Sequence, residues 1–212
     1  MDKAGWRVIE DKEWYRHYAS SRFPYIYESK FATGEASISL ADLEARWGGW
    51  DEGERVQFAQ AFSDKPVLSG EDERILDFLM KQDGEMVSSS IATAVAKLPD
   101  RKRVAGFLTD SLKAFPKTRG NFLCALARLA APETTPDLLS VYMECSRKVG
   151  KGVRDYDSLS DLLYCSAALY RTTKEQKYLD LVNSHLQHPD DQLRSTAENA
   201  ARWAAPPRPA NR

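Results

Sequence analysis

A short segment of small and apolar residues recurs four times in the second half of the chain. The four copies begin at residues 92, 123, 163 and 197, so that successive copies are 31, 40 and 34 residues apart. They read Ala-Thr-Ala-Val-Ala-Lys-Leu, Leu-Cys-Ala-Leu-Ala-Arg-Leu, Leu-Tyr-Cys-Ser-Ala-Ala-Leu and Ala-Glu-Asn-Ala-Ala-Arg-Trp. Because small side chains let neighbouring helices approach closely, this spacing predicts pairs of helices that stack side by side.

From residue 39 onward the chain carries the periodicity of amphipathic helices. Between residues 101 and 115, for example, Val104, Leu108 and Leu112 recur every four positions and leave a charged opposite face. Capping residues precede such segments, and prolines or glycines close them. The predicted N-caps include Ser39, Asp51, Ser69, Asp100 and Asp190. The predicted helices span 40–48, 51–63, 71–82, 85–98, 101–115, 119–131, 136–149, 158–171, 174–187 and 191–205.

The sequence predicts three regions. Residues 1–38 are rich in aromatic side chains and are expected to cap the array. Because Tyr25-Ile26-Tyr27 favours β-structure and residues 35–40 alternate polar with apolar, a short hairpin over 25–38 is one interpretation, and an irregular aromatic cap is the other. Residues 39–205 form the helical repeat domain. Residues 206–212 are rich in proline and are expected to be a disordered tail.

The last copy of the repeat resembles a known family. Residues 189–197 carry Asp191, then Leu193-Arg194, then Ala197, an order common in HEAT units. On this segment and the helix pairing, residues 85–205 resemble HEAT-type repeats. The resemblance implies an all-α fold, a right-handed α-α superhelix of HEAT or armadillo-like stacked helix pairs. The alternative is an irregular helical bundle. HEAT-like arrays mostly bind protein partners, and a minority are enzymes or bind nucleic acid.

Composition excludes several other classes of protein. The net charge is −1, 42% of the residues are hydrophobic, and only three are cysteine, which excludes a disordered chain and a disulfide scaffold. No stretch approaches the roughly 18 apolar residues of a membrane span. The N-terminus has no apolar secretory segment, and the cysteines are widely spaced, so we expect a cytoplasmic protein whose Cys124, Cys145 and Cys165 are packed in the core.

Basic residues concentrate near loops that the repeat model places together. Alternate loops of stacked pairs lie on one edge, which predicts that those near 116–118, 150–157 and 188–190 are neighbours. The candidate partner-binding residues of this edge are Lys113, Lys117, Arg119, Arg147, Lys148, Lys151 and Arg154. They predict a surface for an acidic partner or a phosphate backbone. The alternative is that they complement helix C-termini and aid solubility.

His185 and His188, three residues apart near two aspartates, are weak candidates for a metal site. The alternative, which we favour, is that they hydrogen-bond the carbonyls at the end of a helix. The sequence contains no phosphate-binding loop, dinucleotide fingerprint, zinc-protease motif or hydrolase nucleophile motif. We therefore expect no cofactor.

Two functions follow as hypotheses. The first is a non-enzymatic protein-protein interaction scaffold or adaptor that uses the HEAT-like surface. The alternative is a nucleic-acid-binding protein, with a resemblance to the HEAT-like DNA glycosylases that act on alkylated bases. Tyr156, Tyr164 and Trp203 are its aromatic candidates. The sequence leaves the oligomeric state open.

Overall fold

A computed structural model of the chain describes residues 38–62, 65, 67–82, 84–150 and 156–205, together with the backbone of two short strands. The chain forms two compact units, Met1–Ile75 and Leu76–Arg212. Helices dominate the described residues, which confirms the predicted all-α class. The unit boundary falls within a helix, whereas the sequence suggested a boundary at residue 38. Most of the predicted cap and the whole of the predicted tail lie outside the described residues.

The first unit contains a two-stranded ladder that differs from the predicted hairpin. Strand β1 (Arg7–Ile9) pairs antiparallel with β2 (Ile26–Glu28), and Val8 lies opposite Tyr27. The β-prone segment at Tyr27 is therefore a strand, but its partner comes from the N-terminal side rather than from residues 35–40. Ser39 is instead the N-cap of a helix, where its hydroxyl accepts from the N–H of Asp42. At this position the capping residue indicates the local structure better than the alternation of polar and apolar residues over 35–40.

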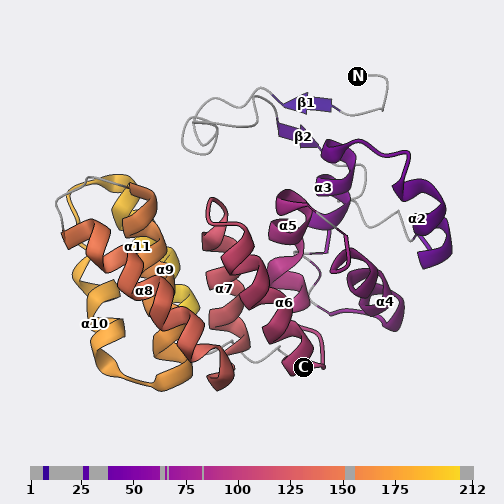
Figure 1. Cartoon of the computed structure of the whole chain (residues 1–212). Coiled ribbons are helices and arrows are strands. Elements are labelled where there is room, and N and C mark those ends of the chain that lie inside the picture. Colours follow the sequence, from indigo (N-terminus) through magenta and orange to yellow (C-terminus); the bar gives the residue numbers. More distant parts are fainter. Residues whose placement is uncertain are drawn as a thin grey trace. The chain divides into compact units, whose positions relative to one another are not determined.

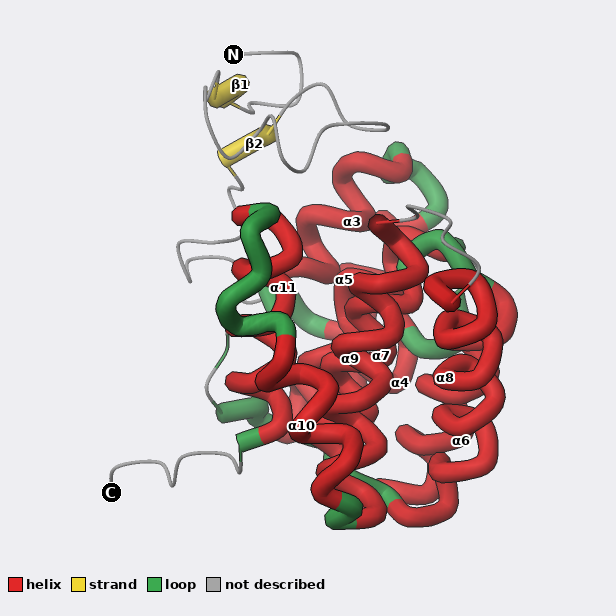
Figure 2. Tube along the Cα trace, turned by 90° about the vertical axis from the view of Figure 1, so that its left-hand side faces the viewer, coloured by secondary structure: helices red, strands yellow, loops and turns green. Residues whose placement is uncertain are grey.

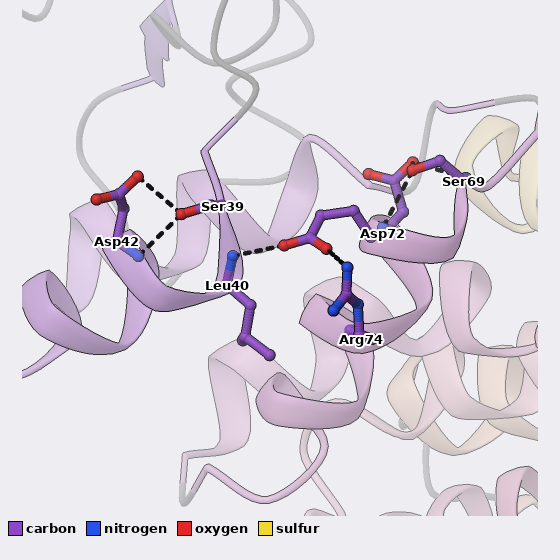
Figure 3. A network of polar contacts seen from close by, with 7 residues as sticks. Ser39, Leu40, Asp42, Ser69, Asp72 and Arg74 are labelled. Atoms are coloured by element: carbon purple, nitrogen blue, oxygen red, sulfur yellow. Dashed lines mark hydrogen bonds and ion pairs between the residues drawn. The ribbon is translucent and has the colours of Figure 1, made fainter.

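Three helices follow in the first unit: α2 (Leu40–Trp47), α3 (Glu52–Gln60) and α4 (Gly70–Leu79), the last of which continues past the unit boundary. Their predicted caps are present. Asp51 forms a full capping box with Glu54, and Ser69 exchanges hydrogen bonds with Asp72 (Figure 3). The N–H of Leu40 donates to Glu71 at 2.7 Å, so a side chain of α4 satisfies the start of α2 (Figure 3).

The second unit is a succession of helices (Figure 1). After α4 they are α5 (Glu85–Val95), α6 (Arg101–Ala114), α7 (Arg119–Leu129), the 3₁₀ turn η1 (Pro132–Thr134), α8 (Thr135–Gly150), α9 (Tyr156–Thr173), α10 (Gln176–Ser184) and α11 (Asp191–Ala204). Each of the ten predicted helices is present in the described part of the chain, with ends that differ by a few residues. Asp100 and Asp190 cap α6 and α11 as predicted.

The four small-residue segments all lie on one layer of helices. Helix α5 packs against α7, α7 against α9, and α9 against α11; α7 and α9 lie side by side in Figure 2. The alanines of these segments face the interior, for Ala92, Ala125, Ala167 and Ala200 are all fully buried. The small side chains thus lie where neighbouring helices meet, as their recurrence predicts.

The other layer consists of α6, α8 and α10. Helix α6 packs on α7, α8 on α9, and α10 on both α9 and α11. Side chains connect the layers: the thiol of Cys165 in α9 donates to the carbonyl of Leu138 in α8 at 3.1 Å. Within the first layer, the amide of Asn121 in α7 donates to Ser89 of α5 at 2.7 Å.

The row of small-residue helices bends so far that α11 also contacts α7. Helix α9 is consequently enclosed by α7, α8, α10 and α11. Residues 122–127 of α7 and 165–169 of α9 are all buried. Because these central helices have so little accessible surface, the surface available to a partner lies on the outer helices and at the helix ends.

Candidate functional site

Helix α8 presents three distinct faces to its surroundings. Leu138, Val141 and Cys145 are buried against the rest of the unit. On the opposite side, four side chains spaced four, three and four residues apart form an exposed row, which we name the α8 ridge: Pro136, Ser140, Met143 and Arg147. A charged flank of Asp137, Glu144 and Lys148 lies between the buried face and the α8 ridge. This separation follows from the 3.6-residue period of the helix.

The ridge combines an exposed apolar side chain with an exposed base. Met143 is 58% exposed and is one of only two large apolar side chains that are exposed among the described residues, the other being Val67. Arg147, one helical turn further along, is exposed and forms no ion pair with any residue that the structure describes. Methionine and arginine are both enriched where proteins bind other proteins.

The flank holds a tight network around Glu144. Arg119, at the start of α7, is only 13% exposed and lies 3.1 Å from the carboxylate of Glu144. Lys148 reaches the same carboxylate at 2.9 Å. Hydrogen bonds from Arg119 and then Lys148 lower the pKa of Glu144. Burial opposes the charge of Arg119, but its hydrogen bond and charge interaction with Glu144 prevail and raise the pKa of the guanidinium.

A second ion pair joins the flank to α6. The ammonium group of Lys113 lies 2.8 Å from the carboxylate of Asp137, in the first turn of α8. The hydrogen bond to Asp137 raises the pKa of Lys113. Both partners are open to solvent, with side-chain exposures of 60% for Lys113 and 30% for Asp137.

The seven predicted partner-binding bases therefore fall into three groups. Lys113, Arg119 and Lys148 are paired with carboxylates of α8. Lys117 and Arg147 are exposed and have no ion pair within the described part of the chain. Lys151 and Arg154 lie outside the described residues.

Sequence reasoning missed the two acidic side chains that neutralise part of this surface. Glu144 and Lys148 are four residues apart on one helix, a spacing that predicts an ion pair and was available in the sequence. The pair between Lys113 and Asp137 joins two helices, and no local pattern indicates it. The exposure of Met143 was equally hidden, because the sequence alone gives no reason to separate Met143 from the other apolar residues of 136–149.

The two histidines form hydrogen bonds at the end of a helix. The ring nitrogen Nδ1 of His185 lies 3.0 Å from the carbonyl oxygen of Leu181, and Nδ1 of His188 accepts from the N–H of Asp190 at 3.1 Å. The rings stack on each other with centroids 5.8 Å apart. These contacts fit the helix-end alternative. Among the described residues no group of three metal-ligating side chains comes together.

The cysteines are buried, as predicted, and their surroundings disfavour the thiolate. Burial raises the pKa of Cys145 to about 11 and those of Cys124 and Cys165 further. A nucleophilic cysteine needs the opposite shift. The aromatic candidates are also engaged internally: Tyr164 and Trp203 pack on the cluster around Ala197, and the hydroxyl of Tyr156 lies 2.7 Å from that of Thr196.

Comparison of the sequence with protein-family models and with curated proteins finds no match, and no solved structure matches either. Within the described ranges, none of the helices combines the length and the apolar character needed to cross a lipid bilayer.

Proposed function

We propose that this chain is a non-enzymatic protein-protein interaction scaffold or adaptor, and that it binds an acidic partner on the α8 ridge and the bases beside it. The observation that carries the proposal is the exposure of Met143 next to Arg147, which is exposed and has no ion pair to any described residue. Exposed methionine and arginine side chains are enriched at the centre of protein interfaces.

The charge around the ridge favours an acidic partner. Helix α8 bears Arg147 and Lys148 and pairs with Lys113 and Arg119, and its own Asp137 and Glu144 form ion pairs with three of these four bases. The remaining base, Arg147, is exposed on the α8 ridge and forms no ion pair with any described residue, so it is the base that an acidic partner could contact directly. Complementary charge steers the encounter of partners and discriminates against wrong ones.

The helical repeat explains why the ridge is available. The buried row of α5, α7, α9 and α11 supports the interpretation of residues 85–205 as HEAT-like repeats, with the right-handed superhelix that the resemblance implies. In such arrays the outer helices are free to vary their exposed residues, because packing constrains only their inner faces. The three free, buried thiols fit the reducing conditions of the cytoplasm.

The experiment that tests this proposal measures binding of a fluorescein-labelled glutamate peptide with one central leucine to the full chain at low salt. We expect Met143→Ala and Arg147→Ala each to weaken binding by about two- to fivefold, the effect of losing one surface contact. Arg202→Ala is the matched control, since it removes an exposed base from α11. Equal binding by all four proteins, or an equal loss in Arg202→Ala, would reject the α8 ridge.

A second arm of the same experiment replaces the peptide with a single-stranded oligonucleotide of equal net charge. Both probes respond to salt, so the comparison is made at one ionic strength. We expect the peptide to bind more tightly, because the leucine can contact Met143. Tighter binding of the oligonucleotide, weakened by Arg147→Ala, would replace the proposal with the nucleic-acid alternative.

A further inference from the structure

The two ion pairs on the flank of α8 differ in what holds them together. Arg119 is largely buried, its Nε atom has no hydrogen-bond partner within the described residues, and it depends on Glu144 to compensate its charge. Lys113 is mostly exposed, and water can solvate its ammonium group whenever the contact with Asp137 opens. Exposed pairs of this kind contribute little to stability, so the second pair can exchange partners readily.

Asp137 does not depend on Lys113 in return. Asp137 lies in the first turn of α8, where the helix dipole favours a negative charge. Opening the pair therefore leaves both groups in favourable surroundings. The pair of Arg119 and Glu144 differs, because loss of Glu144 leaves the largely buried guanidinium of Arg119 without its counter-charge.

We infer that Asp137 is a specificity-determining residue of the α8 surface: it occupies Lys113 and so competes with the carboxylates of an acidic partner for that base. This inference rests on the proposed function. Among the described bases of this set, Lys117 and Arg147 form no ion pair, so a partner with few acidic groups finds these two bases and is repelled by Asp137. A densely acidic partner displaces Asp137 from Lys113 and gains a third base. Built-in competition of this type raises selectivity at the expense of affinity.

The experiment uses the same labelled glutamate peptide and the full chain at physiological salt. Asp137→Asn removes the competing charge and frees Lys113, so we expect the peptide to bind about two- to fivefold more tightly. Glu133→Gln is the matched control. This variant removes one exposed carboxylate from η1, which directly precedes α8 in the sequence. No ion pair to Glu133 occurs in the described part of the chain. Because salt screens charges beyond roughly 8 Å, we expect the control to have a smaller effect.

A double-mutant cycle separates release of Lys113 from a general change of charge. In a Lys113→Gln background, Asp137→Asn should no longer strengthen binding. The inference is overturned if Asp137→Asn does not strengthen binding, if it does no more than Glu133→Gln, or if its effect persists without Lys113. Failure of the proposed function is a different result, in which the wild-type chain does not bind the peptide at low salt.

Discussion

The guanidinium group of Arg119 lies 3.1 Å from the carboxylate of Glu144, and this contact joins the first turn of α7 to the middle of α8. The contact thereby joins α7 of the buried layer to α8 of the outer layer, which carries both Lys148 and the α8 ridge. Since Arg119 is largely buried, the pair is a structural element of the surface rather than a contact that a partner could take over.

Replacing this carboxylate should make the chain less stable in a pH-dependent way. The pKa of Glu144 in the folded chain is lowered from 4.5, so its stabilisation is present above that value and is lost as the pH falls through the folded pKa. We expect Glu144→Gln to lose about 1 kcal/mol at neutral pH, a modest figure because solvent reaches Glu144 and screens the pair.

The measurement is urea unfolding of the wild type and the variant over a series of pH values. The difference between them should shrink as the solution is acidified. Glu198→Gln serves as the control, because Glu198 is exposed on α11 and has no ion pair within the described residues. A difference that is constant with pH would show that Glu144 acts through packing alone.

The small side chains at the helix contacts should not tolerate enlargement. Ala197 of α11 is fully buried in a cluster with Leu163, Ala167 and Val182. We expect Ala197→Leu to destabilise the chain by about 1–3 kcal/mol, since the extra volume forces the helices apart. Ala114→Leu, at an exposed position of α6, should change stability by less than about 0.5 kcal/mol. Equal unfolding free energies for both variants would contradict close packing of the small-residue helices.

The three thiols should be inert in the folded chain. Each is buried with a raised pKa, so almost no thiolate is available at mildly alkaline pH. We expect an aromatic disulfide reagent to modify all three cysteines rapidly in denaturant and none of them rapidly under native conditions. Fast reaction of any cysteine in the native chain would reopen the question of a nucleophilic role.

The features that could be predicted from the sequence are those that nearby residues determine. Asp51, Asp100 and Asp190 cap their helices because each accepts hydrogen bonds from N–H groups two or three positions ahead, which is information within one turn. The buried row of small-residue helices was predictable for a related reason. Small apolar residues recurring at the period of a helix pair have few roles other than close helix packing.

The features that escaped prediction depend on how helices cross. The contact of α11 with α7 reflects the curvature of the row, which follows from many packing contacts and from no single motif. The contact of Lys113 with Asp137 joins α6 to the first turn of α8, and no local pattern in the sequence predicts it. The strand pairing of β1 with β2 is equally non-local.

Site-directed photocrosslinking tests whether the α8 ridge is the surface that meets a partner. p-Benzoylphenylalanine is introduced in place of Met143, and in place of Asn183, an exposed residue of α10, in a matched protein. If a partner binds at the α8 ridge, irradiation in cells of origin should give a discrete crosslinked species from position 143. This species should be absent when the crosslinker is at position 183, and it should be lost when Arg147→Ala is added. The same species from both positions, or none from position 143, would contradict binding at the α8 ridge.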